Sequence, residues 1–386
     1  MRLDIINSCP DFDSYRAARV KSLFNVEDAS RFELTADLEI DDMDWSVGLI
    51  VGPSGSGKTS LGRQVFKADR MACLDWPQDR PIIDVIAHGG DFDDATAALA
   101  SVGLGSVPSW LRPYQVLSNG EKFRADLARI VCDQPQEIVI DEFTSVVDRQ
   151  IAKIGALAFG KAWRRTKGRA VLLSCHYDII DWLDPDWIYD TATGVFTGRC
   201  HRRRPAIILE IRQTGWEWWR YFEPHHYLKV PNAIAARCYV GFVDGQPVAH
   251  LAMSTRPGLT EGRACRLVVM PEWQGAGIGL KFLNAVCAAW RRGQNPYALP
   301  LPTLINTSHP GLIKALRRHP LWAQVSVSLY GSAKARSAAA ISLSAGRTKA
   351  GYGGHFRAAQ GFRYVEGIDL RRACELEDVL SVACPP

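Results

Sequence analysis

One short segment constrains this chain more than any other: GPSGSGKTS, residues 52–60, which directly follows the apolar run Val47–Val51. A short apolar run that ends at glycine predicts a buried strand. Gly52, Gly57, Lys58 and Thr59 then satisfy the pattern GxxxxGK[ST], whose glycines let successive backbone N–H groups turn inward around phosphates. The sequence therefore predicts a nucleotide site between a strand and a helix, in an α/β fold.

The polar residues of this segment have expected tasks. We expect Lys58 to reach the β- and γ-oxygens of ATP and the Thr59 hydroxyl to bind Mg²⁺. The expected ATP contacts within the segment are Gly52, Ser54, Gly55, Gly57, Lys58, Thr59 and Ser60.

An acidic pair supplies the second part of the site. In EIVIDEF, Glu137–Ile140 predicts a buried strand whose end presents Asp141 and Glu142. We expect Asp141 to hold the Mg²⁺ and Glu142 to polarise the attacking water. Two carboxylates that merely end a surface strand are the less favoured alternative.

The segment LSNGE, residues 117–121, precedes a helix with apolar spacing and resembles the LSGGQ signature of the ABC ATPase superfamily. The other family elements follow in the expected order. Gln78 is the Q-loop, Ser145–Asp148 is the D-loop, and His176, after a strand at 170–174, is the switch histidine. The resemblance covers about the first 200 residues.

The chain departs from the ABC pattern in two ways. Asn119 and Glu121 replace the glycine and glutamine of the signature, and only about 40 residues separate Gln78 from Ser118. The helical segment that usually couples such an ATPase to a transporter is therefore short. A transporter subunit working with separate membrane chains remains an alternative, which the second half of the chain disfavours.

The resemblance implies how the ATPase assembles. In this family, the signature of one subunit closes on the ATP held by another subunit, because its serine and helix N-terminus complete the γ-phosphate site. One P-loop and one signature per chain then imply a head-to-tail homodimer with two ATPs, contacted by Ser118 and Gly120. The resemblance further implies that His176 contacts the γ-phosphate and that Gln78 contacts the metal or water.

The second half begins with elements that predict an α+β domain. We expect a strand at Ala206–Arg212, an amphipathic helix over the aromatic cluster at 216–222, and a hairpin whose strands, 238–243 and 247–254, flank Asp244-Gly245. Core packing explains most of the rings, and base stacking is the minority hypothesis.

The stretch ACRLVVMPEWQGAGIGLKFLNAVCAAW resembles motif A of the GNAT acyltransferases, [QR]xxGx[GA]. A strand at Arg266–Met270 leads to a turn, followed by a helix through Trp290. Glycines there allow the backbone to approach the pyrophosphate of acetyl-CoA or another acyl-CoA at a helix N-terminus. The ending AAQGFRYVEG resembles the GF-containing helix-to-strand end of the same fold. The expected acyl-CoA contacts are Gln274, Gly275, Gly277 and Gly279.

Acyl transfer to an amine needs a base and a proton donor for the leaving thiolate. In many GNAT members a tyrosine five residues before the GF phenylalanine is that donor, but Phe362 places Arg357 there. Arginine cannot donate in the same way at neutral pH. Tyr330, Tyr352 and His355 are nearby candidates, and His225 and His226 with Tyr227 form a second polar cluster, whose structural role is about as plausible as a base or a metal site.

Charge separates the two halves. Residues 1–200 hold 22 Lys and Arg against 30 Asp and Glu, a net of −8, whereas the remaining residues hold 24 against 11, a net of +13. So basic a half indicates a polyanionic partner. GGHFRAAQGFRYVEG with HHYL also resembles, over a short span, the Mom-type phage DNA-modification acyltransferases.

The remaining features exclude other classes. The 386 residues predict two or three domains, placed here at 1–200 and 205–375. No apolar run approaches the roughly 18 residues that cross a bilayer. The first residues, MRLDIINSCPDFDSY, lack a basic region followed by an apolar core, so we do not expect them to act as a secretory signal. The ten cysteines form no CxxC pair, which favours reduced thiols in the cytosol.

We therefore expect a cytosolic ABC-type ATPase joined to a GNAT-type acyltransferase that modifies nucleic acid or another polyanion. Two alternatives stay open. The first is a nucleic-acid-binding ATPase whose GNAT-like domain has lost its chemistry. The second is a protein or small-molecule acetyltransferase regulated by ATP.

Overall fold

The computed structural model describes residues 1–8, 14–24, 31–66, 70–87, 89–198, 204–228, 236–255, 258–330, 357–365 and 382–383. They belong to two compact units, each taken separately below. The first draws on Met1–Asp75, Asp133–Ala156 and Gly160–Arg203; the second draws on Trp76–Cys132, Leu157–Phe159 and Arg204–Pro386. The signature segment thus belongs to the unit that also contains the predicted acyltransferase. The predicted boundaries, 1–200 and 205–375, stay a prediction.

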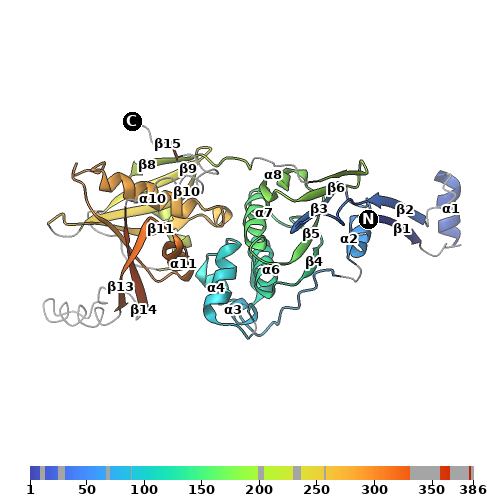
Figure 1. The fold of residues 1–386 in the computed structure, drawn as a ribbon, viewed down its shortest axis with the longest axis horizontal. Coiled ribbons are helices and arrows are strands. Elements are labelled where there is room, and N and C mark those ends of the chain that lie inside the picture. Colours follow the sequence, from blue (N-terminus) through green and yellow to red (C-terminus); the bar gives the residue numbers. More distant parts are fainter. Residues whose placement is uncertain are drawn as a thin grey trace. The chain divides into compact units, whose positions relative to one another are not determined.

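The first unit is built on a five-stranded sheet in the order β4-β5-β3-β6-β7 (Figure 1). Its first four strands are parallel, and the edge strand β7 runs antiparallel to β6. The strands are β3 (Val47–Val51), β4 (Glu137–Ile140), β5 (Arg169–Ser174), β6 (Trp187–Asp190) and β7 (Val195–Thr197). The strands predicted at 47–51, 137–140 and 170–174 are confirmed. The helices are α2 (Lys58–Val65), α7 (Arg149–Trp163) and α8 (Ile180–Leu183), with a 3₁₀ turn at Tyr177–Ile179.

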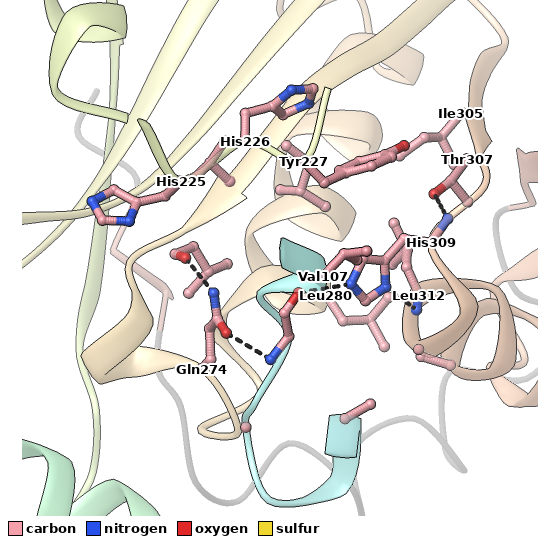
Figure 2. Close-up of a pocket in the computed structure, with 18 of the residues that line it drawn as sticks. Val107, His225, His226, Tyr227, Gln274, Leu280, Ile305, Thr307, His309 and Leu312 are labelled. Atoms are coloured by element: carbon pink, nitrogen blue, oxygen red, sulfur yellow. Dashed lines mark hydrogen bonds between the residues drawn. The ribbon is translucent and has the colours of Figure 1, made fainter. Parts of the chain in front are cut away.

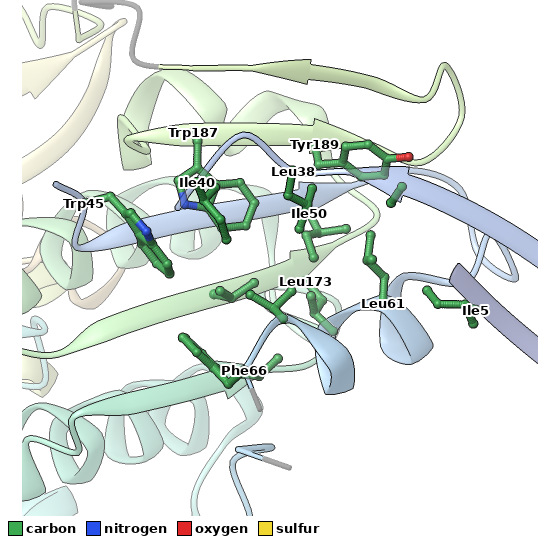
Figure 3. Close-up of a cluster of buried hydrophobic side chains, with 14 residues drawn as sticks. Ile5, Leu38, Ile40, Trp45, Ile50, Leu61, Phe66, Leu173, Trp187 and Tyr189 are labelled. Atoms are coloured by element: carbon green, nitrogen blue, oxygen red, sulfur yellow. The ribbon is translucent and has the colours of Figure 1, made fainter. Parts of the chain in front are cut away.

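A separate two-stranded ribbon completes this unit. Strand β1 (Arg2–Ser8) pairs antiparallel with β2 (Arg31–Asp37), and helix α1 (Tyr15–Phe24) lies between them in the sequence. The hydrophobic cluster in Figure 3 joins the ribbon to the sheet: Ile5 of β1, Ile50 of β3 and Leu61 of α2 are all fully buried. Burial of each such side chain stabilises the fold by about 1.5–3 kcal/mol. The start of α2 is therefore held by packing from both sheets.

The second unit contains four α-helices among the described residues of 82–133, the last of which follows Ser118 of the signature. They are α3 (Ile82–Val85), α4 (Phe92–Ser101), α5 (Val107–Trp110) and α6 (Asn119–Asp133), with a 3₁₀ turn at Tyr114–Val116. Asp91 caps α4 by accepting a hydrogen bond from the Asp94 backbone N–H at 2.9 Å. The helix predicted after LSNGE is confirmed as α6.

An eight-stranded sheet forms the rest of this unit, in the order β13-β14-β12-β11-β10-β9-β8-β15. Its neighbouring strands are antiparallel except for two parallel pairs, β11 with β12 and β8 with β15. The strands are β8 (Leu209–Thr214), β9 (Arg237–Val243), β10 (Gln246–Thr255), β11 (Gly262–Val269), β12 (Thr303–Thr307), β13 (Trp322–Tyr330), β14 (Arg357–Tyr364) and β15 (Val382–Ala383). The helices are α9 (Trp219–Phe222), α10 (Ile278–Arg291) and α11 (Pro310–Arg318), with 3₁₀ turns at Trp216–Trp218, Glu223–His225 and Pro271–Trp273.

The predicted hairpin is confirmed as β9 and β10. Asp244 and Gly245 both have positive φ, 49° and 75°, as a two-residue type I′ turn requires. The helix predicted through Trp290 is confirmed as α10. No helix among the described residues is long and apolar enough to cross a membrane.

Four details of the second half differ from prediction. The first strand runs over Leu209–Thr214 rather than 206–212, because it is these residues that pair with β9. The aromatic cluster forms a 3₁₀ turn and a four-residue helix, since Gly215 and Pro224 confine it to eight residues. The strand before the glycine turn runs over Gly262–Val269 rather than 266–270.

The GF pair gives the fourth correction. Gly361 and Phe362 lie inside β14, where they pair with both β12 and β13, and do not form the end of a helix. Gly361 is required there because a Cβ atom would approach Ser326 Oγ to 2.3 Å. The register that assigned the tyrosine position to Arg357 therefore lacks its expected structural context.

Candidate active sites

The P-loop has the geometry that its sequence predicts. Gly57 precedes α2 with φ 85°, and Gly55 has φ 78° with open space where a Cβ atom would point. The Lys58 ammonium donates to the backbone oxygens of Gly52 and Pro53 at 2.8 and 2.6 Å. Ser60 accepts a 2.7 Å hydrogen bond from the Asn7 side chain of β1. The loop is thus an open cradle of N–H groups with one cation at its centre.

A cavity of about 450 Å³ lies against this loop, and it gathers most of the predicted nucleotide residues of the first unit. Thr59 and Asp141, the two expected Mg²⁺ ligands, both line it. Both offer the oxygen donors that Mg²⁺ prefers, and one or two carboxylates are enough when phosphates complete the shell. The cavity is lined by Asn7, Phe32, Ser54, Gly55, Gly57, Lys58, Thr59, Ser60, Asp141, Glu142, Ser145, Leu173 and Cys175.

Glu142 has an unusual backbone conformation for a non-glycine residue. Its φ is 48°, and its N–H donates to Asp141 Oδ1 at 2.8 Å. The next residue, Phe143, donates its N–H to the Leu173 carbonyl of β5 at 2.8 Å. Left-handed backbone at such a residue costs free energy and is typical of functional sites. The turn holds both carboxylates at the cavity wall.

Phe32 was missed by sequence reasoning. It is 36% exposed, lines the nucleotide cavity, and packs so closely on the P-loop that a Cβ atom on Gly57 would lie 2.8 Å from its ring. An exposed aromatic ring beside a phosphate cradle is suited to stack on a base. An aromatic residue shortly before the P-loop strand is the signal that could have identified it.

His176 lies directly after Cys175, which lines the cavity, but it is not itself among the lining residues. Its ring Nδ1 lies 3.4 Å from Thr144 Oγ1, and its backbone N–H donates to Ser174 Oγ at 3.1 Å. Burial, with the nearby charge of Arg149, lowers the pKa of His176. The imidazole is therefore neutral at pH 7.

The signature residues, in the second unit, form a capping box at the start of α6. Ser118 donates through both its N–H and its hydroxyl to Glu121 Oε2, at 2.9 and 2.8 Å, and accepts from the Glu121 N–H at 3.3 Å. Burial alone would raise the pKa of Glu121, but hydrogen bonds from Ser109 and Ser118 outweigh it and lower the pKa. Glu121, one of the two departures from the LSGGQ pattern, thus anchors the signature serine. Ser118 and Gln78 are exposed, and Gly120 is partly buried.

The glycine turn before α10 has the same backbone conformation as the end of the P-loop. Gly277 precedes the helix with φ 85°, and a Cβ atom there would meet nothing within 4 Å. Gly275 also has positive φ, 93°, whereas Gly279 lies inside α10, where a Cβ atom would come within 2.9 Å of Val269. Gly277 therefore leaves backbone open for a ligand, and Gly279 lets the helix approach β11.

A cavity of about 370 Å³ begins at this turn (Figure 2). Strands β11 and β12 pair only over Gly262–Ala264 and Thr303–Ile305, and beyond those residues both strands line the cavity. The pairing of β11 with β10 also shifts register next to Arg266, whose φ is 55°. Beyond the paired residues the two strands no longer bond to each other, and the cavity lies between them.

The structure discriminates among the candidates for acid–base work. His225, His226 and Tyr227 line the cavity, whereas Tyr352 and His355 lie outside the described residues, as does the side chain of Tyr330. In Figure 2, Tyr227 extends toward Ile305 and Thr307, while His225 points in another direction. His226 packs against Trp219, with ring centroids 5.5 Å apart, and its Nδ1 bonds the Leu228 backbone. Among the described residues, no group of three or more His, Cys, Asp or Glu is placed to hold a metal.

Gln274 and His309 hold the segment between α4 and α5 against this cavity. Gln274 accepts from the Gly105 N–H at 2.9 Å and donates to the Val269 carbonyl at 2.9 Å. His309 Nε2 lies 3.0 Å from the Gly105 carbonyl, and its Nδ1 accepts from the Leu312 N–H. Burial lowers the pKa of His309. Both imidazole nitrogens are thus engaged, and neither His309 nor any contact of residue 105 was expected from the sequence.

Comparisons with known proteins match the two parts of the chain to different families. Residues 208–299 match the model of the acetyltransferase (GNAT) family. Over 166 residues the chain is 31% identical to the cytochrome c biogenesis ATP-binding export protein CcmA of Rhodospirillum rubrum, covering 34% of this chain and 68% of that protein.

Two solved structures are also similar to the chain. One is a dimeric, post-hydrolysis structure of the ATP-binding cassette MJ0796 bound to ADP and Pi, with a TM-score of 0.36 and 12% identity over 45% of this chain and 94% of that chain. The other is a bacterial Atm1-family ABC exporter with ATP bound, with a TM-score of 0.30 and 21% identity over 42% of this chain and 33% of that chain.

A P-loop, an acidic strand end and a signature helix define the class as an ATP-binding cassette. The chain belongs to the ABC-type ATPases. It also carries an acetyltransferase domain of the GNAT family, so both enzymatic activities are indicated.

Proposed function

We propose that this chain hydrolyses ATP at the P-loop and transfers an acyl group from acyl-CoA to an amine of a polyanionic acceptor, foremost a nucleic acid. The cavity that opens between β11 and β12 and reaches the Gly277 turn carries the acyltransferase part. The net charge of +13 in residues 201–386 supports the choice of acceptor.

The cavity suits the two ends of an acyl-CoA differently. Gly277 leaves room for a pyrophosphate at the N-terminus of α10, where N–H groups and the helix dipole favour negative charge. The separated strands offer backbone partners to the amide chain. Gln274 and Gly275 shape the turn, and Gly279 lets α10 lie close to β11.

Tyr227 is the proton donor that we assign to the reaction, because it lines the cavity and its side chain extends toward Ile305 and Thr307 of β12 (Figure 2). The acceptor nitrogen forms a bond to the acyl carbon as the carbon–sulfur bond breaks. Tyr227 gives its phenolic proton to the leaving thiolate, and the proton from the attacking nitrogen goes to solvent, from which the phenolate is reprotonated. His225, exposed at the cavity rim, is placed to pass that proton outward.

At the ATP site, the residues supply binding and orientation. Gly52, Gly55, Gly57 and Lys58 hold the phosphates, and Thr59 and Asp141 hold Mg²⁺, which neutralises the phosphate charge. Glu142 orients the attacking water. Gln78, Ser118, Gly120 and His176 keep the roles that the ABC resemblance implies.

A head-to-tail homodimer and a cytosolic location belong to the same proposal. Ser118 and Asn119 are exposed at the start of α6, as a signature that meets a second subunit needs to be. The relative in Rhodospirillum rubrum is an export protein. In this chain, residues within 100–107 of the ATPase helical segment line the acyl cavity. This supports the chain's own acyltransferase domain, rather than a transporter, as the partner of the ATPase. The Mom-type resemblance stays a prediction.

The test supplies radiolabelled acetyl-CoA to the purified chain with, in separate reactions, DNA, RNA, a mixture of proteins and a polyamine. Label in a nucleic acid that disappears in the Tyr227→Phe variant supports the proposal. Label confined to protein or polyamine favours an ATP-regulated acetyltransferase of another acceptor. Acetyl-CoA binding without transfer to any acceptor favours the non-catalytic domain and overturns the acyltransferase assignment.

A further inference from the structure

The wall of the acyl cavity is partly made of ATPase residues. Five residues from the end of α4 to the start of α5 line the cavity together with the glycine turn and α11. In Figure 2 this segment passes beside Gln274 and His309. The contributing residues are Ala100, Ser101, Gly103, Gly105 and Val107. A GNAT-like half alone therefore lacks one side of the cavity.

The contact is specific rather than merely close. Both backbone polar groups of Gly105 are bound: its N–H donates to Gln274 and its carbonyl lies within hydrogen-bond distance of His309. Gly103, with φ 84°, packs so tightly that a Cβ atom would lie 2.2 Å from the Gln274 carbonyl oxygen. On the other side of the segment, a Cβ atom on Gly311 would lie 2.7 Å from Ala100. Two backbones at such distances cannot shift independently.

The signature helix reaches the same point through Arg124. This residue lies on α6, is 3% exposed, and donates through Nη1 to the carbonyls of Gly103 and Pro271. Pro271 begins the turn that leads to Gly277. Burial lowers the pKa of Arg124 to about 10, so it is charged at pH 7. One buried cation thus connects the helix that begins with the signature to the turn that begins the acyl-CoA site.

We propose that acyl-CoA binding and engagement of the signature by ATP are thermodynamically coupled through Arg124 and the Gly103–Gly105 segment. This inference rests on the proposed function, because it takes acyl-CoA as the ligand of the cavity. A ligand at the Gly277 turn stabilises one position of the segment, and ATP closing on Ser118 stabilises one position of α6. Since Arg124 joins the two, the affinity for each ligand depends on the presence of the other.

The test measures both affinities in the full chain by isothermal titration calorimetry. The dissociation constant of acetyl-CoA is determined without nucleotide and with saturating Mg²⁺ and AMP-PNP; that of AMP-PNP is determined without and with acetyl-CoA. We expect both constants to change by one common factor of about 5 to 150, because linkage is reciprocal. In Arg124→Met this factor falls to near one, while Arg124→Lys, which keeps a donor, retains part of it.

Control variants separate the contact from the fold. Arg129→Met removes the same charge from the same helix, but its guanidinium lies 5.1 Å from the Trp76 ring centroid, and we expect it to keep the full factor. If Arg124→Met does not fold, His309→Phe serves instead, since it keeps a ring beside Trp110 and removes both hydrogen bonds.

The outcomes distinguish the two proposals. Wild-type protein that does not bind acetyl-CoA overturns the proposed function. Binding that is insensitive to AMP-PNP leaves the proposed function intact and overturns the coupling. Equal coupling in the wild type, Arg124→Met and His309→Phe overturns the route through Arg124 and Gly105.

Discussion

The chain contains two glycine turns of the same shape whose following residues differ in chemistry. Both the P-loop and the turn before α10 place a glycine with φ 85° directly before a helix. The following residues are Lys58 and Thr59 in the first case and Ile278 and Gly279 in the second. The first turn therefore adds a cation and a metal ligand to its N–H groups, whereas the second offers N–H groups and a helix dipole alone. Under the proposed function, the shared backbone shape accounts for phosphate binding at both turns, and the two residues after the glycine account for the difference between a metal-bound triphosphate and a pyrophosphate.

The surroundings of the two turns differ as well. Around the P-loop, an exposed ring and two carboxylates border an open cavity. Behind the second turn, Gln274 and Gly275 are packed against Gly103 and Gly105. We therefore expect the first turn to depend on its side chains and the second to depend on its neighbours.

Among the variants that test this comparison, we expect the largest effect from Lys58→Ala. Loss of the only cation that the P-loop itself carries should lower ATP hydrolysis by about 10²- to 10³-fold or more. Acetyl-CoA affinity measured without nucleotide should stay within about two-fold of the wild type, because the second turn has no share in this lysine. A phosphate-release assay and calorimetry measure the two quantities. Hydrolysis that survives the change contradicts the assignment of the P-loop.

Gly277→Glu is the corresponding change at the second turn. The new carboxylate points into open space beside the expected pyrophosphate, and like charges at that distance cost several kcal/mol, so acetyl-CoA affinity should fall by at least about 100-fold. Gly277→Ala adds only left-handed strain of about 1–2 kcal/mol.

Gly245→Glu is the matched control for Gly277→Glu. It has positive φ and open space in the β9–β10 turn, and it should leave the acetyl-CoA affinity unchanged. A Gly277→Glu protein that binds acetyl-CoA as well as this control does would place the ligand elsewhere.

Acid should destabilise the acyltransferase half through His250. This residue is fully buried among Trp216, Trp219 and Phe222, and burial lowers its pKa to about 4. The unfolded chain binds a proton near pH 6.5 and the folded chain does not, so stability is complete above pH 6.5 and is lost as the pH falls toward 4. Between pH 7 and pH 5 the loss is about 2 kcal/mol.

Urea unfolding at the two pH values measures this loss in the free energy of unfolding. His250→Asn removes the titrating group and should reduce the loss by most of that amount, even if the variant is less stable at pH 7. An undiminished pH effect in the variant assigns the acid sensitivity to other groups, such as His309, whose pKa burial also lowers.

The smallest effect expected here comes from Phe32→Ala. Loss of one stacked ring should weaken ATP binding by about 1–2 kcal/mol, or roughly 5- to 30-fold, and Phe32→Tyr should keep most of the affinity. Because Phe32 lines the nucleotide cavity and not the cavity at the second turn, acetyl-CoA affinity should not change. Fluorescence titration with a labelled ATP analogue checks the effect, and equal affinity in Phe32→Ala removes Phe32 from the site.

The sequence was enough to predict those parts of the two sites that consecutive residues determine. The strand Val47–Val51, the helix after LSNGE and the glycine turn at Gly277 were predictable because contiguous residues determine them. The position of Phe362 was not, because a GF pair fits a strand interior as well as a helix-to-strand end, and only pairing with β12 and β13 decides between them.

The contacts between the Gly103–Gly105 segment and the acyl cavity could not be predicted from sequence patterns. Gly105 and Gln274 are 169 residues apart, and Gly105 and His309 are 204 apart. Neither Gly103 nor His309 belongs to a recognisable sequence motif. Each is required by a residue that only the tertiary fold brings next to it. Gln274 lines the cavity, and its side-chain amide also bonds Gly105 and Val269, which the motif did not indicate; its contact with acyl-CoA stays a prediction.

The shared cavity wall has a consequence for how such a protein can be cut, recombined or inherited. An ATPase and a transferase joined end to end can be exchanged with those of other proteins, since each carries its own complete surface. Here residues 100–107 belong to the ATPase in sequence and to the transferase in space. A transferase expressed from residue 205 onward lacks that wall, and a helical segment grafted from another ATPase brings the wrong one. A change in residues 100–107 is therefore a change in both the ATPase sequence and the wall of the transferase cavity.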